Sequence, residues 1–186
     1  MINAERRARF IELCRERSFE RKRVVLASGR ESDFFIDCKQ TILTAEGHAL
    51  SGELLFEALS ELPECDAVAG VELGGCPLAS AVSLISFQRG RSLPALYVRK
   101  ERKDHGSAKL VEGDKALFPG IRVVLLEDVV TTGGSSLRAV EALKSAGAKV
   151  VGIAALVDRL EGGGETIRAA GLPLVTLATR ADFMGE

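Results

Sequence analysis

Two adjacent acids, Glu127 and Asp128, follow the apolar run Val123–Leu126 and precede a turn of threonine, glycine and serine at residues 131–135. The apolar run predicts a strand covered on both faces, and open α/β sheets bind ligands beyond the carboxyl ends of such strands. A helix beginning near Ser135 would direct unpaired N–H groups and its positive dipole end into the turn, where a phosphate can bind. The carboxylates can accept hydrogen bonds from sugar hydroxyls or bind a divalent cation. The segment therefore predicts a site for a phosphorylated sugar.

A second cluster is basic and lies between residues 99 and 109. It comprises six potential cations, Arg99, Lys100, Arg102, Lys103, His105 and Lys109. Like charges at this density repel one another, so we expect a loop that orders when a polyanion neutralises it, as a closing lid does. A solvated surface loop with no ligand is the alternative.

The segment Val123–Val140 resembles the phosphoribosyl pyrophosphate (PRPP) signature of type I phosphoribosyltransferases, and it lacks the glycine patterns of a P-loop or a Rossmann turn. The basic segment resembles the lid of orotate phosphoribosyltransferases, Arg-Lys-x-x-Lys-x-His-Gly. Three further segments, Leu26–Asp37, Gly70–Ala79 and Val157–Glu161, resemble that family's motifs and occur in its order. The resemblance therefore covers nearly the whole chain.

This resemblance implies roles for individual residues. The implied PRPP-binding residues are Arg99, Lys100, Lys103, His105, Glu127, Asp128, Val129, Val130, Thr131, Thr132, Gly133, Gly134 and Ser135. The implied catalytic residues are Lys103, His105 and Asp128, and the implied orotate-binding residues are Phe34, Phe35, Thr131 and Arg159. A pyrophosphate loop is implied at Glu72, Leu73, Gly74 and Gly75, with a cis peptide bond between Glu72 and Leu73.

The chain departs from the family pattern at two positions. Many members carry lysine where this chain has Ala27, and some carry lysine where it has Gly74. The missing positive charge could come from Lys39, or from the backbone N–H groups of Gly74 and Gly75.

The resemblance implies transfer of ribose 5-phosphate from PRPP to orotate, giving orotidine 5′-monophosphate and pyrophosphate in pyrimidine (UMP) biosynthesis. It implies Mg²⁺ carried by PRPP, with no protein ligand assigned, and a homodimer in which each lid completes the neighbouring site. Three alternatives stay open at this stage: a phosphoribosyltransferase for another base, a PRPP-sensing regulator without catalysis, and a nucleotide-binding structural domain.

Bulk properties fit a compact cytoplasmic enzyme. A chain of 186 residues with 46% hydrophobic composition predicts one domain. The net charge of −1 argues against a nucleic-acid partner, and no apolar stretch is long enough to span a membrane. The four cysteines have no metal-site spacing, so we expect reduced thiols. The polar N-terminus does not resemble a signal peptide.

Alternating strands and helices predict an α/β fold with a mainly parallel central sheet flanked by helices. We expect a small N-terminal hood over residues 1–44, and an α/β core over 45–186 with a lid loop at 99–115. The expected helices are 4–17, 45–62, 77–88, 136–146 and 165–170. The expected strands are 24–27, 34–38, 67–71, 96–98, 123–126, 150–157 and 174–177, with a flexible turn at Gly162, Gly163 and Gly164.

Overall fold

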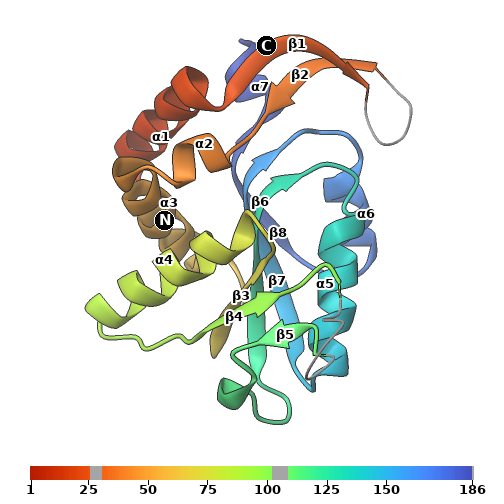
Figure 1. Cartoon of the computed structure of the whole chain (residues 1–186). Coiled ribbons are helices and arrows are strands. Elements are labelled where there is room, and N and C mark those ends of the chain that lie inside the picture. Colours follow the sequence, from red (N-terminus) through yellow and green to blue (C-terminus); the bar gives the residue numbers. More distant parts are fainter. Residues whose placement is uncertain (26–30, 102–108, 186) are drawn as a thin grey trace.

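The computed structural model of this chain describes residues 1–25, 31–101 and 109–185. Its strands are β1 (Phe19–Val25), β2 (Glu31–Ile36), β3 (Ala67–Val71), β4 (Ala95–Val98), β5 (Val111–Glu112), β6 (Arg122–Val130), β7 (Lys149–Asp158) and β8 (Leu174–Thr179). Its helices are α1 (Ala4–Arg17), α2 (Lys39–Ile42), α3 (Ala45–Ala58), α4 (Gly75–Gln88), α5 (Gly134–Ser145), α6 (Gly163–Ala169) and α7 (Arg180–Met184). Figure 1 shows β1 and β2 as a separate ribbon at one end of the central sheet.

The central sheet has the strand order β5-β4-β3-β6-β7-β8. All neighbours are parallel except β4 and β5, which are antiparallel. The chain moves outward from β3 to β4 on one side and from β6 through β7 to β8 on the other. The strand order therefore reverses between β3 and β6, and a crevice for a ligand is expected at the carboxyl ends of these two strands. The predicted α/β class is confirmed.

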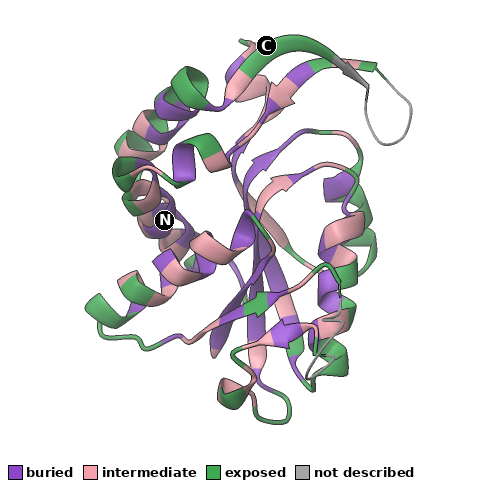
Figure 2. Ribbon diagram, viewed as in Figure 1, coloured by how far each residue is buried: buried purple, intermediate pink, exposed green. Residues whose placement is uncertain are grey.

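Alternation along β6 divides the core into two layers. Val124 and Leu126 belong to a hydrophobic cluster with residues of α3 and α4, whereas Val123 and Leu125 belong to a second cluster with residues of α5 and α6. Successive strand residues point to opposite faces, so a sheet with helices on both sides needs uninterrupted apolar strands. The buried colour runs along the centre of the sheet in Figure 2.

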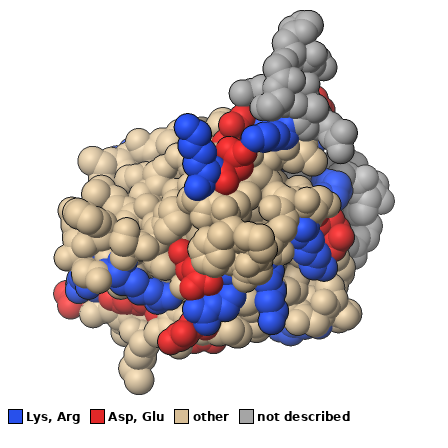
Figure 3. Space-filling view, turned by 90° about the horizontal axis from the view of Figure 1, so that it is seen from below, with Lys and Arg blue, Asp and Glu red and all other residues tan. Residues whose placement is uncertain are grey.

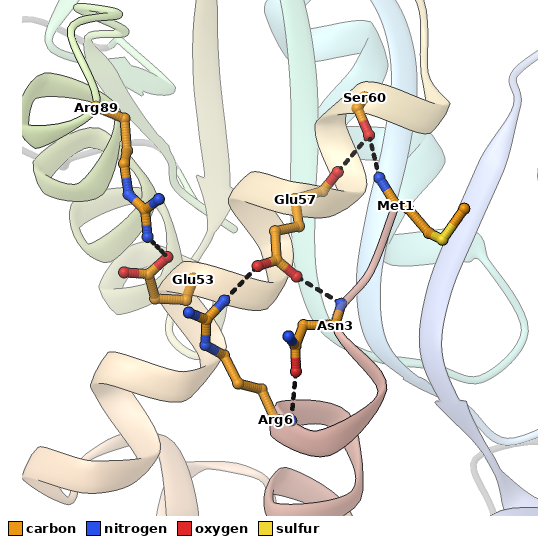
Figure 4. A network of polar contacts seen from close by, with 7 residues as sticks. All are labelled: Met1, Asn3, Arg6, Glu53, Glu57, Ser60 and Arg89. Atoms are coloured by element: carbon orange, nitrogen blue, oxygen red, sulfur yellow. Dashed lines mark hydrogen bonds and ion pairs between the residues drawn. The ribbon is translucent and has the colours of Figure 1, made fainter.

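The N-terminal helix α1 is joined to the core by polar contacts with α3 (Figure 4). The Glu57 carboxylate accepts from the Asn3 backbone N–H at 2.7 Å and from Arg6 Nη1 at 2.5 Å. The amino group of Met1 donates to Ser60 Oγ at 3.2 Å. A buried apolar face that includes Phe10 and Leu13 lies on the same helix. These contacts hold the first part of the chain against the sheet layer.

Several predicted boundaries are wrong. β6 continues to Val130 instead of ending at Leu126, because it pairs with β7 as far as the Val130–Asp158 register. The two acids therefore lie within the strand. Gly163 and Gly164 belong to α6, so Gly162 alone precedes the helix. A Cβ at Gly163 would be 2.4 Å from the Thr131 carbonyl oxygen, which shows that this glycine permits close packing.

The predicted lid range of 99–115 contains two short elements near its end. Val111 and Glu112 form β5 against β4, and Asp114–Ala116 forms a short 3₁₀ turn. The reason is apolar burial, since the Val111 side chain is only 4% exposed. Prediction by charge alone overlooked this single core residue.

No helix in the described ranges is sufficiently long and apolar to cross a membrane. On the face shown in Figure 3, basic and acidic side chains lie close to one another. This face therefore carries mixed charge, in agreement with the small net charge of the chain.

Candidate active site

The predicted pyrophosphate loop and the acidic pair meet at the crevice between β3 and β6. Gly74 follows β3, and a Cβ added to it would lie 2.0 Å from Asp128 Oδ2 in β6. Such an approach is possible only without a side chain, so the glycine and the carboxylate are in direct contact. The peptide bond between Glu72 and Leu73 is cis, which confirms that prediction.

Glu127 is the more enclosed of the two acids, with a residue exposure of 4%. Ser136, in the first turn of α5, donates its hydroxyl to Glu127 Oε1 at 2.7 Å. The pKa of Glu127 is raised to about 7, chiefly by burial; the Ser136 hydroxyl opposes this shift, the neighbouring Asp128 adds to it, and Lys100 opposes it. The carboxyl group can therefore change its charge near neutral pH.

Asp128 is partly exposed and faces the N-terminal part of the chain. Its Oδ1 accepts the backbone N–H of Val129 at 2.9 Å. Burial raises the pKa of this carboxyl, against the Val129 hydrogen bond and the positive charge of Lys39. Lys39 is itself held by an ion pair with Asp37 Oδ1 at 2.5 Å. The positive charge of Lys39 therefore favours the ionised form of Asp128.

The turn after β6 has the form of an anion site. Gly133 precedes α5 with φ +80°, which a residue with a side chain rarely adopts. No described residue accepts a hydrogen bond from the N–H groups of Thr131, Thr132 or Gly133. Gly134 and Ser135 then begin the helix, so unpaired donors and the positive helix end share one place.

Val129 and Val130 were also predicted to bind PRPP. The Val130 side chain is 1% exposed and packs in the core, and Val129 packs against the opposite core cluster. Both side chains therefore help to anchor the end of β6.

Lys100 and Arg99 lie at the end of β4, beside the pyrophosphate loop. The Lys100 backbone N–H donates to Glu72 Oε1 at 2.6 Å, which ties the two segments together. Arg99 Nη1 lies 3.4 Å from Glu112 Oε1, and the Arg99 backbone N–H donates to the Leu110 carbonyl at 2.8 Å. Arg99 is thereby positioned where the basic segment leaves and rejoins the sheet.

Of the residues predicted to bind orotate, Thr131 lies in the turn after β6, and Arg159, immediately after β7, contacts Phe34 of β2. Arg159 is 8% exposed, and its Nη2 donates to the Phe34 carbonyl oxygen at 2.9 Å and lies 2.9 Å from Glu161 Oε1. Arg159 Nε is buried and has no described hydrogen-bond partner. Both described contacts use Nη2, so Nε and Nη1 keep donors without a described partner.

The two phenylalanines differ in role. The Phe34 ring is 0% exposed and packs against Phe19 and Phe183, with centroid distances of 5.2 and 5.9 Å. Phe35 is partly exposed, and the Lys22 ammonium lies 3.9 Å from its ring centroid. The Phe34 ring is enclosed in the core. Phe34 therefore contributes to the site through its backbone carbonyl oxygen, which accepts the hydrogen bond from Arg159.

A cavity of about 870 Å³ adjoins the phosphate turn. Its walls include Gly134 and Ser135 at one end, Arg99 and Lys100 beside them, and the α5 face that carries Arg138. Glu127 and Asp128 do not line it, and the cavity extends along α5.

The structure brings together most predicted site residues, but it does not describe three of the residues named in the sequence analysis. Lys103 and His105 lie in the range 102–108, and Ala27 lies in the range 26–30, both outside the described residues. Two contributors were overlooked in the sequence. Ser136 was taken as an ordinary helix residue, and α7, which supplies Phe183 to the Phe34 ring, was not predicted. The run of hydroxyl residues that continues through Ser136 was the signal that could have indicated the role of this serine.

Sequence comparison identifies the class of protein. A family model described as "Phosphoribosyl transferase domain" matches residues 44–169. The orotate phosphoribosyltransferase of Sorangium cellulosum is 74% identical over 183 residues, covering 98% of this chain and 95% of that protein. The orotate phosphoribosyltransferase of Bradyrhizobium sp. (strain BTAi1) is 45% identical over 187 residues, covering 99% of this chain and 100% of that protein.

Solved structures give the same result. Mycobacterium tuberculosis orotate phosphoribosyltransferase in complex with Fe(III) dicitrate is 38% identical, with a TM-score of 0.81, and the match covers 96% of this chain and 99% of that one. The same enzyme in complex with PRPP is 36% identical, with a TM-score of 0.78, covering 96% and 98%. The chain therefore belongs to the phosphoribosyl transferase family, and within it to the orotate phosphoribosyltransferases.

Proposed function

We propose that this protein transfers ribose 5-phosphate from PRPP to orotate, producing orotidine 5′-monophosphate and pyrophosphate for pyrimidine biosynthesis. The observation that carries the proposal is the 74% identity to an orotate phosphoribosyltransferase over 98% of the chain. The contact between Gly74 and the Asp128 carboxylate at the strand-order reversal supports it independently, because an acid there lies beside the predicted pyrophosphate loop.

The substrate is held at three places. The turn from Thr131 to Ser135 binds the 5′-phosphate through its backbone donors. Glu127 and Asp128 bind the ribose hydroxyls, and their negative charge stabilises the positive charge that develops on the ribose as its bond to pyrophosphate breaks. Orotate lies on the Arg159 side, where the guanidinium faces its negative charge.

Pyrophosphate is held by the loop from Glu72 to Gly75 and by cations at the end of β4. Arg99 and Lys100 are the described cations, and Lys103 and His105 are assigned from the sequence pattern. Exclusion of water around the departing pyrophosphate protects the reactive ribose from hydrolysis.

Mg²⁺ accompanies PRPP in this proposal. The described residues contain no group of three His, Cys, Asp or Glu side chains arranged to hold a metal. Oxygen atoms of pyrophosphate and ribose suit Mg²⁺, so PRPP itself supplies ligands. The ion would offset charge on the leaving pyrophosphate. No protein ligand is assigned.

The protein acts as a cytoplasmic homodimer in which the basic segment of one subunit completes the site of the other. A two-fold axis allows such an exchange in both directions. The four free cysteines, Cys14, Cys38, Cys65 and Cys76, suit a reducing compartment.

Pyrophosphate release with a panel of bases tests the proposed function. Purified protein is incubated with PRPP and Mg²⁺, together with orotate, adenine or hypoxanthine. Of the three bases, we expect only orotate to cause release of pyrophosphate from PRPP. Release with a purine alone would assign another base, and PRPP binding without release would indicate a regulator.

A further inference from the structure

The hydroxyl of Ser136 is placed to control one oxygen of Glu127. Ser136 is 1% exposed and Glu127 is 4% exposed, and Ser136 Oγ donates to Glu127 Oε1 at 2.7 Å. No described residue donates to the second oxygen, Oε2. One carboxylate oxygen is therefore fixed inside the protein, and the other is left without a protein donor.

This arrangement joins two elements that form the site. Glu127 lies near the end of β6, and Ser136 lies in the first turn of α5, immediately after the phosphate turn. A buried hydrogen bond to a charged group is among the stronger polar interactions in proteins. The rotation of the Glu127 carboxyl is consequently coupled to the position of the helix that begins at the phosphate turn.

We propose that Ser136 is a positioning residue, which holds Glu127 Oε1 so that Oε2 is presented to a ribose hydroxyl of the substrate. The inference deepens the proposed function and rests on it, because it assumes that Glu127 receives the ribose. Ser136 itself does not touch the substrate.

The electrostatic surroundings of Glu127 make this role measurable through pH. Asp128 from β6 opposes its ionisation, Lys100 from the end of β4 favours it, and the residue opposite in β7 is the uncharged Ala155. Ser136 is the contribution of α5, and it also favours the anion. Loss of this donor should therefore raise the pKa of Glu127 and delay formation of the anion to higher pH.

The first test measures kcat/KM for PRPP as a function of pH in wild type, Ser136→Ala and Ser136→Thr. Ser136→Ala should lower kcat/KM roughly 10- to 50-fold near neutral pH, the loss expected for one hydrogen bond to a charged group. The acid limb of the pH profile, which is the fall in kcat/KM at low pH, should move to higher pH. The reason is that kcat/KM reports the ionisation of groups in the free enzyme, here Glu127. Ser136→Thr keeps the hydroxyl and should restore most of the activity and the original acid limb. Ionisation of PRPP is common to all three and cancels in the comparison.

A double-mutant cycle with Glu127→Gln tests whether Ser136 acts through Glu127. In the Glu127→Gln background, Ser136→Ala should change kcat/KM by no more than about twofold. A loss as large as in the wild-type background would overturn the proposal, because the serine would then act independently of the acid.

Ser86→Ala is the matched control for removal of a buried serine hydroxyl. Ser86 is 0% exposed in α4, donates to the Ser83 carbonyl at 2.7 Å and accepts from the Leu93 N–H at 3.1 Å. It should lower the melting temperature as Ser136→Ala does, and leave the acid limb unchanged.

The outcomes separate the two proposals. Wild-type protein without transfer activity would refute the proposed function. Active wild type with an unchanged Ser136→Ala pH profile would refute only the role of Ser136. If Ser136→Ala does not fold, Ser136→Gly, which also lacks the hydroxyl, replaces it in the comparison. An acid limb at higher pH in Ser136→Gly than in wild type, Ser136→Thr and Ser86→Ala supports the role, and identical limbs in all four proteins refute it.

Discussion

The α-carbon of Gly74 lies against the Asp128 carboxylate, so closely that an added Cβ would be 2.0 Å from Oδ2 and 2.3 Å from Cγ. Gly74 follows β3, and Asp128 lies near the end of β6. The strand order reverses between these two strands. The chain has glycine at a position where some family members carry lysine. The contact explains why a side chain at this position requires a different arrangement of the acid.

Gly74→Ala should therefore displace the Asp128 carboxylate and lower kcat/KM for PRPP by at least about tenfold, since small misplacements of a site group are costly. Gly74→Ala combined with Asp128→Asn should be little worse than Asp128→Asn alone, because both changes act on the same carboxylate. Steady-state kinetics of the three variants check this. Full activity in Gly74→Ala would show that the observed carboxylate position is unnecessary.

Asp128→Asn should lower kcat/KM for PRPP on the order of 100-fold, the scale seen when one electrostatic stabiliser is removed. Its melting temperature should be equal to or higher than that of wild type, because burial already disfavours the charged carboxyl. Thermal unfolding and kinetics on the same preparation measure both quantities. A large drop in melting temperature with intact activity would contradict the assigned role.

Glu127→Gln should stabilise the fold in a pH-dependent way. The pKa of Glu127 is about 7 in the folded protein, against an ordinary value of 4.5 for a glutamate. Between these pH values the folded state binds the proton more tightly, so stability of the wild type falls as pH rises from the lower to the higher value and then levels off. The loss is at most on the order of 3 kcal/mol.

Urea denaturation at pH 5 and pH 8 measures this effect. The gain in free energy of unfolding from Glu127→Gln should be larger at pH 8 than at pH 5, while the exposed control Glu141→Gln should show no such difference. An equal gain at both pH values would mean that Glu127 does not titrate in this interval.

Phe34→Ala should cost about 3–5 kcal/mol of stability, as is usual for a fully buried phenylalanine. The adjacent Phe35→Ala should cost about 1 kcal/mol, because its ring is partly exposed and its described partner is an exposed lysine. Urea denaturation of the two variants gives the comparison. Similar costs would show that Phe34 is not the aromatic anchor that the structure indicates.

The parts of the site that could be predicted from the sequence are those that a local pattern of residue types marks. The acids, the glycine turn and the β3 loop could be located because apolar runs marked their strands and glycines marked close approaches. The contact between Ser136 and Glu127 could not be predicted, since it depends on the angle at which α5 leaves β6. Helix α7 was also missed, because its five residues show no full helical period, and its position depends on Phe183 packing against Phe34.

The shared site of the proposed homodimer predicts complementation. Lys103→Ala and the double variant Glu127→Gln, Asp128→Asn should each be nearly inactive as homodimers. After subunit exchange, a mixture should regain part of the activity, because one site of each heterodimer has both intact sets. Activity of the mixture before and after exchange checks this. If heterodimers form and the mixture stays inactive, each subunit uses its own basic segment.

The ultraviolet absorbance of orotate tests the central claim most directly. Wild-type protein with PRPP and Mg²⁺ should cause the orotate absorbance to fall as orotidine 5′-monophosphate forms, and addition of pyrophosphate should reverse the change. Asp128→Asn at the same concentration should give a much slower fall. An unchanged absorbance with folded wild-type protein would contradict the assigned activity, and an equally fast fall with Asp128→Asn would contradict the assigned site.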